Sequence, residues 1–494
     1  MKFNIETSDR ICGNKYFPLT FLVISFFLLL IFSMATSPIF GLAVVDASIF
    51  KMMGHVLLSG GVPYVDYFDH KGPYMYLINA IGETISPSWG LFPIQVVWLT
   101  GSMVLWFKTA RLFVRPTHSF IIVLLASAIF AVVSDSGDMT EEWSLLPCSI
   151  SVYLAVSFLV NKPSEKHRYW RSLVYGLCFG MVFLIRPNDA VMVCGGVMTG
   201  IFLYIIFRQK QYLNAFVNAL AFFAGAIIMA APWIAYFAYH GALENFYFGL
   251  IGFNLHYTGG LSYNLTHIFE IKEIIIICIL LILFVIKTKR QRLLWVLIPI
   301  STYIFMIFGR NNYPHYYMTV IPAIILLFLA MLLSLKFKKA TMIVASLSIV
   351  IIGVISVGFG RIKRVSTHLV EGTIAQKFFA YKQDIEKDKA LLFLVPEEER
   401  DSIWNYGDYD SIVFYNTGII SQNPVPNAIG GQYRPFPKSM EKQLHVTLNK
   451  PLWIFMNYPL TYIYPADSAF IADNYRLVKE SGSSKFILLK RKDE

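Results

Sequence analysis

The chain has 494 residues, of which 56% are hydrophobic and only 15% are charged. Its mean hydropathy of +0.55 is more apolar than the surface of a soluble protein tolerates, which excludes a soluble globular enzyme. The formal net charge of +11 does not indicate nucleic-acid binding, because before residue 361 the basic residues gather in alternate loops between apolar segments. The composition predicts a polytopic α-helical membrane protein.

The apolar segments set the expected number of spans, because a helix needs about 20 apolar residues to cross a hydrocarbon core of about 30 Å. Eleven windows reach or approach this length, near residues 17–42, 90–107, 118–134, 143–160, 171–186, 190–207, 214–237, 274–286, 293–309, 317–335 and 340–359. We therefore expect about eleven transmembrane helices.

The charges in the loops predict the orientation of these helices. Before residue 361, nineteen Lys and Arg residues fall on the side of the N-terminus and five on the other side, whereas the acids divide three to twelve. Basic loops tend to stay on the cytoplasmic side of a membrane. We expect the N-terminus in the cytoplasm, and the acid-rich loops and the segment after residue 360 on the extracytoplasmic side.

The first external loop, at 43–89, is long and is expected to be structured. Asp46 comes directly after the first apolar segment, and residues 47–58 carry apolar side chains at the spacing of a helix on the outer membrane face. Residues 74–86 are apolar but too short to span comfortably, so they predict a second surface helix. The turn between the two helices carries four ionisable candidates, namely Asp66, Asp69, His70 and Lys71.

Three later external turns carry further polar groups. Residues 134–147 hold four acids within eight positions and no base, a cluster that repels itself unless a cation joins it. Residues 186–189 form a very short link between two apolar segments, and residues 310–317 are rich in Asn, His and Tyr. The candidate site residues in these turns are Glu141, Glu142, Arg186, Asn188, Arg310, His315 and Tyr316.

The hydropathy falls from residue 361 onward, where short apolar runs alternate with helical or turn segments. This pattern is typical of a small α/β domain. All five cysteines precede residue 361, so no disulfide framework is available to that domain. The predicted organisation is a transmembrane region at 1–360 and an extracytoplasmic α/β domain at 361–494.

External acids and bases on a wide apolar body suit a reaction between a lipid-borne group and an acceptor in water. In glycosyl transfer from a polyprenyl phosphate, a carboxylate removes the proton of the acceptor hydroxyl while its oxygen attacks the anomeric carbon. The departing lipid phosphate is a weak base, so it needs cations and no general acid. The candidate cations are Lys71, Arg186, Arg310 and His315.

Each candidate also has a purely structural interpretation. Asp46 is a favoured residue type for capping the helix that follows it. Glu141 and Glu142 are equally consistent with solvated loop acids, and arginines at helix ends commonly extend to the membrane interface. Asp66 and Asp69 suit a turn rich in Gly and Pro.

A transporter or flippase of a lipid-linked glycan is the alternative from another class, since it also needs many helices and external polar groups. Transporters usually place ionisable residues near the bilayer midplane and contain paired repeats. In this sequence the acids lie at the ends of the apolar segments and no repeat is visible. These features favour an enzyme.

The order of the motifs resembles that of bacterial GT-C glycosyltransferases related to protein O-mannosyltransferases and lipid A aminoarabinose transferases. The resemblance extends over most of the membrane region, and its elements are Asp46, YFDHKGP at 67–73, TEEWSLLP at 140–147, RPN at 186–188 and HY at 315–316. It implies a GT-C fold in the bacterial cytoplasmic membrane, with Asp46 as the catalytic base.

The resemblance also implies an inverting glycosyltransferase that takes a sugar from a polyprenyl-phosphate donor and places it on a glycan, lipid or protein of the cell envelope. Glu141 or Glu142, together with Asp69, would orient the acceptor or hold a divalent cation. If a cation is used, Asp46, Glu141 and Glu142 are candidate ligands, and their hard oxygen atoms favour Mg²⁺ or Mn²⁺. The remaining substrate-binding candidates are Asp66, His70, Lys71, Arg186, Asn188, Arg310, His315 and Tyr316.

Overall fold

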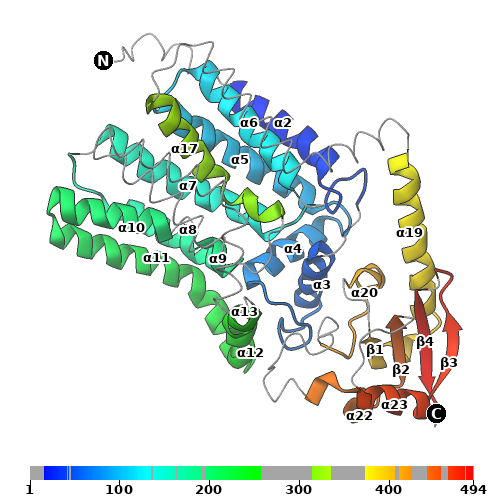
Figure 1. Cartoon of the computed structure of the whole chain (residues 1–494). Helices are drawn as coiled ribbons and strands as arrows, with labels where there is room; N and C mark the ends of the chain where they lie inside the picture. The colour runs from blue at the N-terminus through cyan, green and yellow to red at the C-terminus, as the bar shows by residue number, and fades with distance from the viewer. Residues whose placement is uncertain are drawn as a thin grey trace. The chain divides into compact units, whose positions relative to one another are not determined.

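The computed structural model describes residues 16–41, 43, 46–134, 137–162, 164–190, 195–257, 314–334, 373–406, 411–424, 442–457, 465–483 and 485–492 (Figure 1). The chain divides into two compact units, and each is discontinuous in sequence. Unit 1 comprises Met1–Ser33, Pro93–Trp233 and Thr258–Lys363, and unit 2 comprises Met34–Phe92, Ile234–Tyr257 and Arg364–Glu494. The predicted boundary between residues 360 and 361 lies outside the described residues, so it stays a prediction.

Unit 1 is built mainly of helices. Its described elements are α2 (Tyr16–Phe32), α5 (Leu91–Arg111), α6 (Pro116–Val133), α7 (Thr140–Asn161), α8 (Tyr169–Phe183), α9 (Pro187–Ala190), α10 (Gly196–Leu203), η2 (Tyr204–Gln209), α11 (Tyr212–Tyr239), η5 (Pro314–Met318) and α17 (Ile321–Ser334). The first two residues of α5 and the last six of α11 belong to unit 2. Among the described residues, α5, α7 and α11 are long and apolar enough to cross a membrane. Shorter apolar helices lie at Phe17–Phe32, Pro116–Ala131 and Gly196–Gln209. The windows at 274–286, 293–309 and 340–359 lie outside the described residues, and the count of eleven spans stays a prediction.

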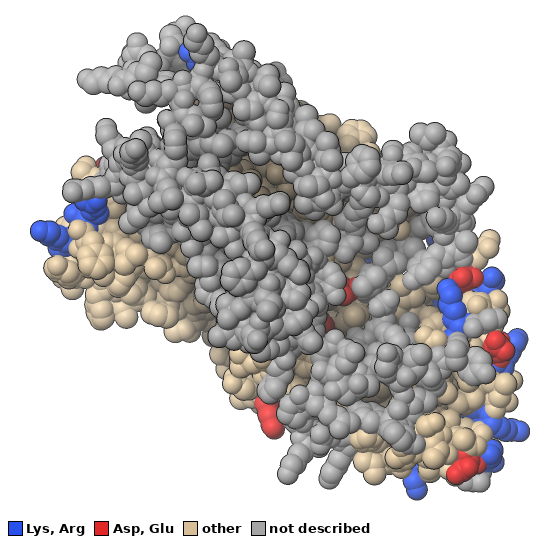
Figure 2. All heavy atoms as spheres, in the orientation of Figure 1, with Lys and Arg blue, Asp and Glu red and all other residues tan. Residues whose placement is uncertain are grey.

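Helix α11 has an apolar outer surface. Leu213, Phe216, Leu220, Phe223 and Ile227 are all exposed, and their spacing of three and four residues places them on one stripe of the helix. In Figure 2 the described surface over α10 and α11 consists mainly of uncharged residues. An apolar stripe of this length is suited to contact with lipid chains.

Helices α8 and α11 approach each other closely at three glycines. A Cβ atom at Gly176 would overlap the carbonyl oxygen of Phe222, and one at Gly180 would lie 2.8 Å from the Cβ atom of Met229. On the facing helix, a Cβ atom at Gly225 would overlap the carbonyl oxygen of Leu173. Small residues four positions apart allow membrane helices to pack backbone against backbone. The Gly176–Gly180 spacing therefore fixes the α8/α11 pair.

Unit 2 contains the two helices expected in the first external loop, α3 (Asp46–Leu58) and α4 (Pro73–Ile85). They pack closely, since a Cβ atom at Gly54 would lie 2.7 Å from the backbone nitrogen of Ala80. Three short elements follow α11, namely α12 (Leu243–Tyr247), η3 (Phe248–Gly252) and α13 (Phe253–Tyr257). The helices expected at 47–58 and 74–86 correspond to α3 and α4, and the external position of this loop stays a prediction.

The C-terminal part of unit 2 contains a four-stranded sheet in the order β1-β2-β4-β3. The strands are β1 (Ile403–Tyr406), β2 (Trp453–Asn457), β3 (Tyr475–Glu480) and β4 (Phe486–Arg491). The β1/β2 pair is parallel and the other two pairs are antiparallel. The helical elements of this part are α19 (Thr373–Leu392), η6 (Glu397–Ser402), α20 (Ile412–Thr417), η7 (Lys442–Leu444), α22 (Val446–Asn449) and α23 (Pro465–Asn474).

Alternating strand residues divide the core of this sheet into two clusters. Ile403 and Phe455 pack with residues of α19 and α20. Their chain neighbours Trp404 and Ile454 point to the other cluster, which includes Ile471 of α23. Because side chains alternate between the faces of a strand, each face of the sheet is covered by its own helices.

We expect Gly176→Ala to destabilise the fold by about 2 kcal/mol, because the new methyl group has no room against the backbone of α11. The control is Gly195→Ala, where the nearest atom to a Cβ is 3.9 Å away. Thermal unfolding in detergent should show a lower Tm for Gly176→Ala and little change for the control. Equal Tm values for the two variants would contradict the close approach of α8 and α11.

Candidate functional site

The two glutamates of the acidic turn lie in the first turn of α7 and are buried, with exposed fractions of 1% for Glu141 and 3% for Glu142. The chain enters α7 through two residues with positive φ, Gly137 at +88° and Asp138 at +58°. Such a tight turn is favoured by Gly and Asp. The alternative that these glutamates are solvated loop acids is wrong, because the entry turn carries them into the interior of unit 1.

Glu142 is held by groups without charge. Its carboxylate accepts hydrogen bonds from the side-chain amide of Gln95, from the Ser134 hydroxyl at 3.1 Å and from the backbone N–H of Asp138 at 3.0 Å. Asp138 itself accepts a hydrogen bond from the indole N–H of Trp143 at 2.8 Å. These contacts fix the turn. They also use much of the hydrogen-bonding capacity of the Glu142 carboxylate, so that less of it is left for a substrate.

Glu141 forms an ion pair with Arg186. Arg186 is the last residue of the short link between α8 and α9, and its side chain is only 13% exposed. The guanidinium also lies 3.8 Å from the carboxylate of Asp189 and 4.1 Å from the centre of the Tyr316 ring. Arg186 is therefore not a residue that extends to the membrane interface. It is a buried cation between carboxylates and an aromatic face.

The structure thus brings Glu141, Arg186 and Tyr316 together in unit 1, as three of the predicted site residues. His315 is also buried, and its ring contacts that of Tyr316 edge to face at 4.8 Å. Asn188 is half-buried on α9. Arg310 lies outside the described residues, and its predicted contact with the lipid phosphate stays a prediction.

In unit 2, the turn between α3 and α4 forms a chain of polar contacts. The buried carboxylate of Asp69 lies 3.3 Å from Nδ1 of His70 and accepts a hydrogen bond from the Tyr76 hydroxyl at 3.2 Å. The other ring nitrogen of His70, Nε2, lies 2.6 Å from the ammonium group of Lys71. A neutral imidazole satisfies both neighbours, because Nδ1–H donates to Asp69 while Nε2 accepts from Lys71.

The electrostatics of this turn agree with that proton arrangement. Burial disfavours ionised Asp69, but the charge of Lys71 and the hydrogen bond with His70 outweigh it and lower the pKa of Asp69. Burial and the Lys71 charge also lower the pKa of His70, against the opposing influence of Asp69 and Asp46. The turn therefore holds an anion, a neutral imidazole and a cation in sequence.

Asp46 is the first residue of α3 and is half-buried. Because its charge acts on the pKa of His70, it lies within electrostatic range of the turn. A common site for Asp46, Asp69, His70 and Lys71 stays a prediction. Asp66 differs from these residues, because its side chain is exposed and accepts a hydrogen bond from the backbone N–H of Val62 at 2.6 Å. That contact is typical of a turn residue.

Several residues that support the turn could not be found from the sequence. The Tyr64 hydroxyl donates to the carbonyl oxygen of Lys71 at 2.6 Å, and the Tyr76 hydroxyl shares its one proton between that oxygen, at 2.8 Å, and the Asp69 carboxylate. The Asn254 amide donates to the carbonyl oxygen of His70 at 2.9 Å. Tyr64 has a φ of +68°, which is unusual for a bulky residue and is common at functional sites. No local sequence pattern identifies Tyr64, Tyr76 and Asn254 as partners of the turn, because their contacts with its backbone arise only when the chain folds.

Among the residues that the structure describes, no group of three or more His, Cys, Asp or Glu side chains is placed to hold a metal ion. Glu141 already has Arg186 as its counter-charge, and Glu142 is satisfied by neutral donors. The described carboxylates therefore form no ready cation site. A divalent cation stays a prediction.

Comparisons with known proteins agree with the sequence resemblance. Residues 70–236 match the family model described as dolichyl-phosphate-mannose-protein mannosyltransferase. No curated protein sequence matches the chain.

Two solved structures share the fold. ArnT from Cupriavidus metallidurans, bound to undecaprenyl phosphate, matches with a TM-score of 0.57 and 12% identity over 96% of this chain and 97% of its own. The oligosaccharyltransferase AglB from Archaeoglobus fulgidus, in complex with an inhibitory peptide and a dolichol-phosphate, matches with a TM-score of 0.51 and 12% identity over 90% and 69%. The predicted resemblance is confirmed, and the chain has the fold of these two structures.

We expect Arg186→Gln to destabilise unit 1 by about 3 kcal/mol, because it leaves the buried Glu141 carboxylate without its cation. The matched control is Arg208→Gln, since Arg208 is exposed. The double variant with Glu141→Gln should recover part of the loss, because both charges are then absent. Thermal unfolding in detergent measures all three, and equal Tm values for the two arginine variants would contradict a structural ion pair.

We expect Lys71→Met to raise the pKa of both His70 and Asp69, because the Lys71 charge lowers both in the native protein. Lys162→Met, which removes an exposed lysine paired with Glu165, should leave the pKa of His70 unchanged. Nuclear magnetic resonance of isotope-labelled histidine side chains in nanodiscs measures the titration. A pKa of His70 that is the same in wild type and Lys71→Met would show that the two side chains do not face each other.

Proposed function

We propose that this chain is an inverting glycosyltransferase that moves a sugar from a polyprenyl-phosphate donor to a cell-envelope acceptor. The transfer would take place on the extracytoplasmic face of the bacterial cytoplasmic membrane. The observation that carries the proposal is the position of Asp46 at the start of α3, within electrostatic range of the Asp69–His70–Lys71 turn, in a chain with the fold of ArnT and AglB. A general base and a nearby cation are the two groups that this reaction needs.

Asp46 is the base in this mechanism. Its carboxylate accepts the proton of the acceptor hydroxyl while the hydroxyl oxygen attacks the anomeric carbon of the donor sugar. The bond between that carbon and the phosphate oxygen breaks, and its electron pair leaves with the polyprenyl phosphate. Attack opposite the leaving group inverts the configuration of the anomeric carbon.

Lys71 is the best-supported cation for the leaving phosphate in unit 2. Its ammonium group donates to neutral His70, and His70 is oriented in turn by Asp69. Asp69 then acts through His70, and its lowered pKa keeps it ionised while the phosphate develops charge. This arrangement gives Asp69 an orienting role and leaves proton removal to Asp46.

The Glu141–Arg186 pair of unit 1 is better suited to binding a sugar than to binding a phosphate. Arg186 shares its charge with Glu141 and Asp189, so it offers a phosphate less charge than an unshared arginine does. A guanidinium carries five N–H donors, and those not used by carboxylates suit the hydroxyl groups of a sugar. We assign this pair to substrate orientation.

The positions of the acids favour an enzyme over a transporter. Asp46 is the first residue of α3, and Glu141 lies in the first turn of α7. Ionisable residues of transporters lie near the middle of the bilayer instead. An assay in reconstituted vesicles separates the two functions. A flippase of a lipid-linked glycan would move its lipid across the membrane without release of polyprenyl phosphate, whereas a glycosyltransferase would release it.

Deleting the gene is expected to remove one sugar residue from an envelope glycan, which mass spectrometry detects and identifies together with its acceptor. Wild-type protein should restore the residue, but Asp46→Asn should not, because loss of a general base lowers turnover by about 10²–10⁴-fold. The control is Asp473→Asn, which changes an exposed aspartate of α23. Full restoration by Asp46→Asn at normal expression would remove Asp46 from the role of base.

A further inference from the structure

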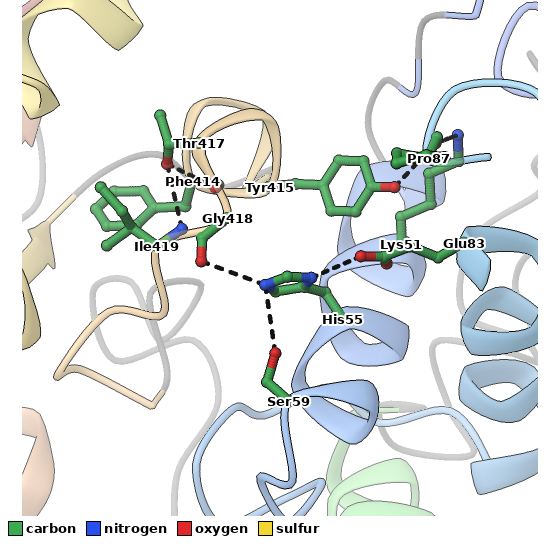
Figure 3. A network of polar contacts seen from close by, with 10 residues as sticks. All are labelled: Lys51, His55, Ser59, Glu83, Pro87, Phe414, Tyr415, Thr417, Gly418 and Ile419. Atoms are coloured by element: carbon green, nitrogen blue, oxygen red, sulfur yellow. Dashed lines mark hydrogen bonds and ion pairs between the residues drawn. The ribbon is translucent and has the colours of Figure 1, made fainter.

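A network of polar contacts joins α20 to the α3/α4 pair within unit 2. Figure 3 shows His55 between Glu83 of α4 and Gly418, the residue that ends α20. Nδ1 of His55 lies 2.6 Å from the Glu83 carboxylate, and Nε2 lies 3.2 Å from the Gly418 carbonyl oxygen. Ser59 lies on the same side, 3.5 Å from Nε2.

A doubly protonated ring satisfies this contact best. A carbonyl oxygen and a carboxylate are both acceptors, so each ring nitrogen of His55 must donate to satisfy both. A neutral imidazole has one N–H and can satisfy only one of them. The second carboxylate oxygen of Glu83 is buried without a hydrogen-bond partner among the described residues, which leaves His55 as the main compensation for this carboxylate.

A second set of contacts joins the same elements. The Lys51 ammonium group donates to the carbonyl oxygens of Ala35, Pro87 and Ser88 at 3.1, 3.1 and 3.2 Å. The hydroxyl of Tyr415, on α20, donates to the Pro87 carbonyl oxygen at 2.9 Å. Lys51 also lies 5.8 Å from the centre of the Tyr415 ring. The carbonyl of Pro87 is thus shared by α3 and α20.

Gly418 can end α20 because glycine readily adopts the left-handed backbone conformation found there. It ends α20 with a φ of +70°, a conformation that glycine adopts at little cost and that commonly ends helices. A Cβ atom there would lie 3.8 Å from Nε2 of His55. The left-handed turn therefore brings the carbonyl group and the imidazole together without a side chain between them.

The contact bears on Asp46 because both residues belong to one helix. Asp46 begins α3, and His55 and Lys51 lie on the same thirteen-residue helix. Nine residues of an α-helix extend over roughly 14 Å, and a helix of this length transmits a displacement of one end to the other. Fixing α3 at His55 and Lys51 therefore fixes the direction in which it presents Asp46.

We propose that protonated His55 is a positioning residue, which pins α20 of the C-terminal segment to α3 and α4 and thereby holds Asp46 in place. This role for Asp46 rests on the proposed function. The pinning itself does not, because it is a property of the fold. The C-terminal segment then supports the helix that carries Asp46.

The contact is linked to pH. The hydrogen bond with Glu83 raises the pKa of His55, against the effect of burial. The facing groups are Glu83 of α4, Lys51 of α3 itself and the Tyr415 ring of α20. A pKa that is higher in the folded than in the unfolded chain means that the stabilisation is complete below about pH 6.5, the ordinary pKa of histidine, and is lost as the pH rises through the folded value.

Hydrogen–deuterium exchange of the full-length protein in nanodiscs tests the pinning without any substrate. We expect amides of α3 and α20 in wild type to be protected near pH 6 and to exchange about tenfold faster near pH 8.5, after correction for the intrinsic rate. His55→Gln should give fast exchange at both pH values. His240→Gln, which changes an exposed histidine just after α11, should behave as wild type.

Glu83→Gln provides a second variant in case His55→Gln fails to fold. Its amide oxygen can still accept from Nδ1–H, but without the carboxylate the protection should be lost at a lower pH than in wild type. Protection of α3 and α20 that does not change with pH in wild type would overturn the proposal. The same would follow if Glu83→Gln left the pH midpoint unmoved.

Turnover tests the effect on Asp46. The probe is the lipid extract of a deletion strain, in which we expect unused donor to accumulate, and the readout is release of polyprenyl phosphate. In wild type we expect kcat to decline at alkaline pH, and we expect His55→Gln to lower kcat about tenfold with KM for the donor within twofold and to abolish this decline. Unchanged kcat and pH profile would overturn the positioning role. Absence of turnover by wild type would instead overturn the proposed function and would leave the pinning to the exchange measurements.

Discussion

The carboxylates of Glu141 and Glu142 are removed from water at the first turn of α7, and this burial determines much of what surrounds them. An ionised carboxylate in an apolar interior is strongly destabilising unless a cation or several hydrogen-bond donors face it. Arg186 supplies the cation for Glu141, and Gln95 and Ser134 supply donors for Glu142. The link after α8, the start of α5 and the entry to α7 are thereby held in one arrangement.

The same requirement acts in unit 2 with a different result. Asp69, His70 and Lys71 are neighbours in sequence and satisfy one another in a row, so the turn contains its own counter-charges. Tyr64, Tyr76 and other parts of the chain then hold the backbone of the turn in place. In unit 1 the compensation joins distant segments, whereas in unit 2 it is local.

Features with a local cause could be predicted from the sequence. The apolar windows located α5, α7 and α11, and the helical spacing in the first external loop located α3 and α4. Pairings between distant residues could not be predicted, because no periodicity relates their positions. Lys51 and His55 have the appearance of ordinary polar residues on a surface helix, and the partner of His55 lies 363 residues further along the chain. The burial of Glu141 and Glu142 likewise could not be predicted from the sequence, since acids in a turn that is expected to be external are usually solvated.

Unit 2 combines segments from both ends of the chain. The Tyr67 hydroxyl contacts Ser411, 344 residues away, and the backbone N–H of Phe68 donates to the Pro424 carbonyl oxygen. During synthesis on the ribosome, residues 34–92 of unit 2 are therefore made long before these partners. This part of unit 2 therefore stays incomplete until the C-terminal segment has been synthesised, and a chain whose synthesis stops early cannot complete it.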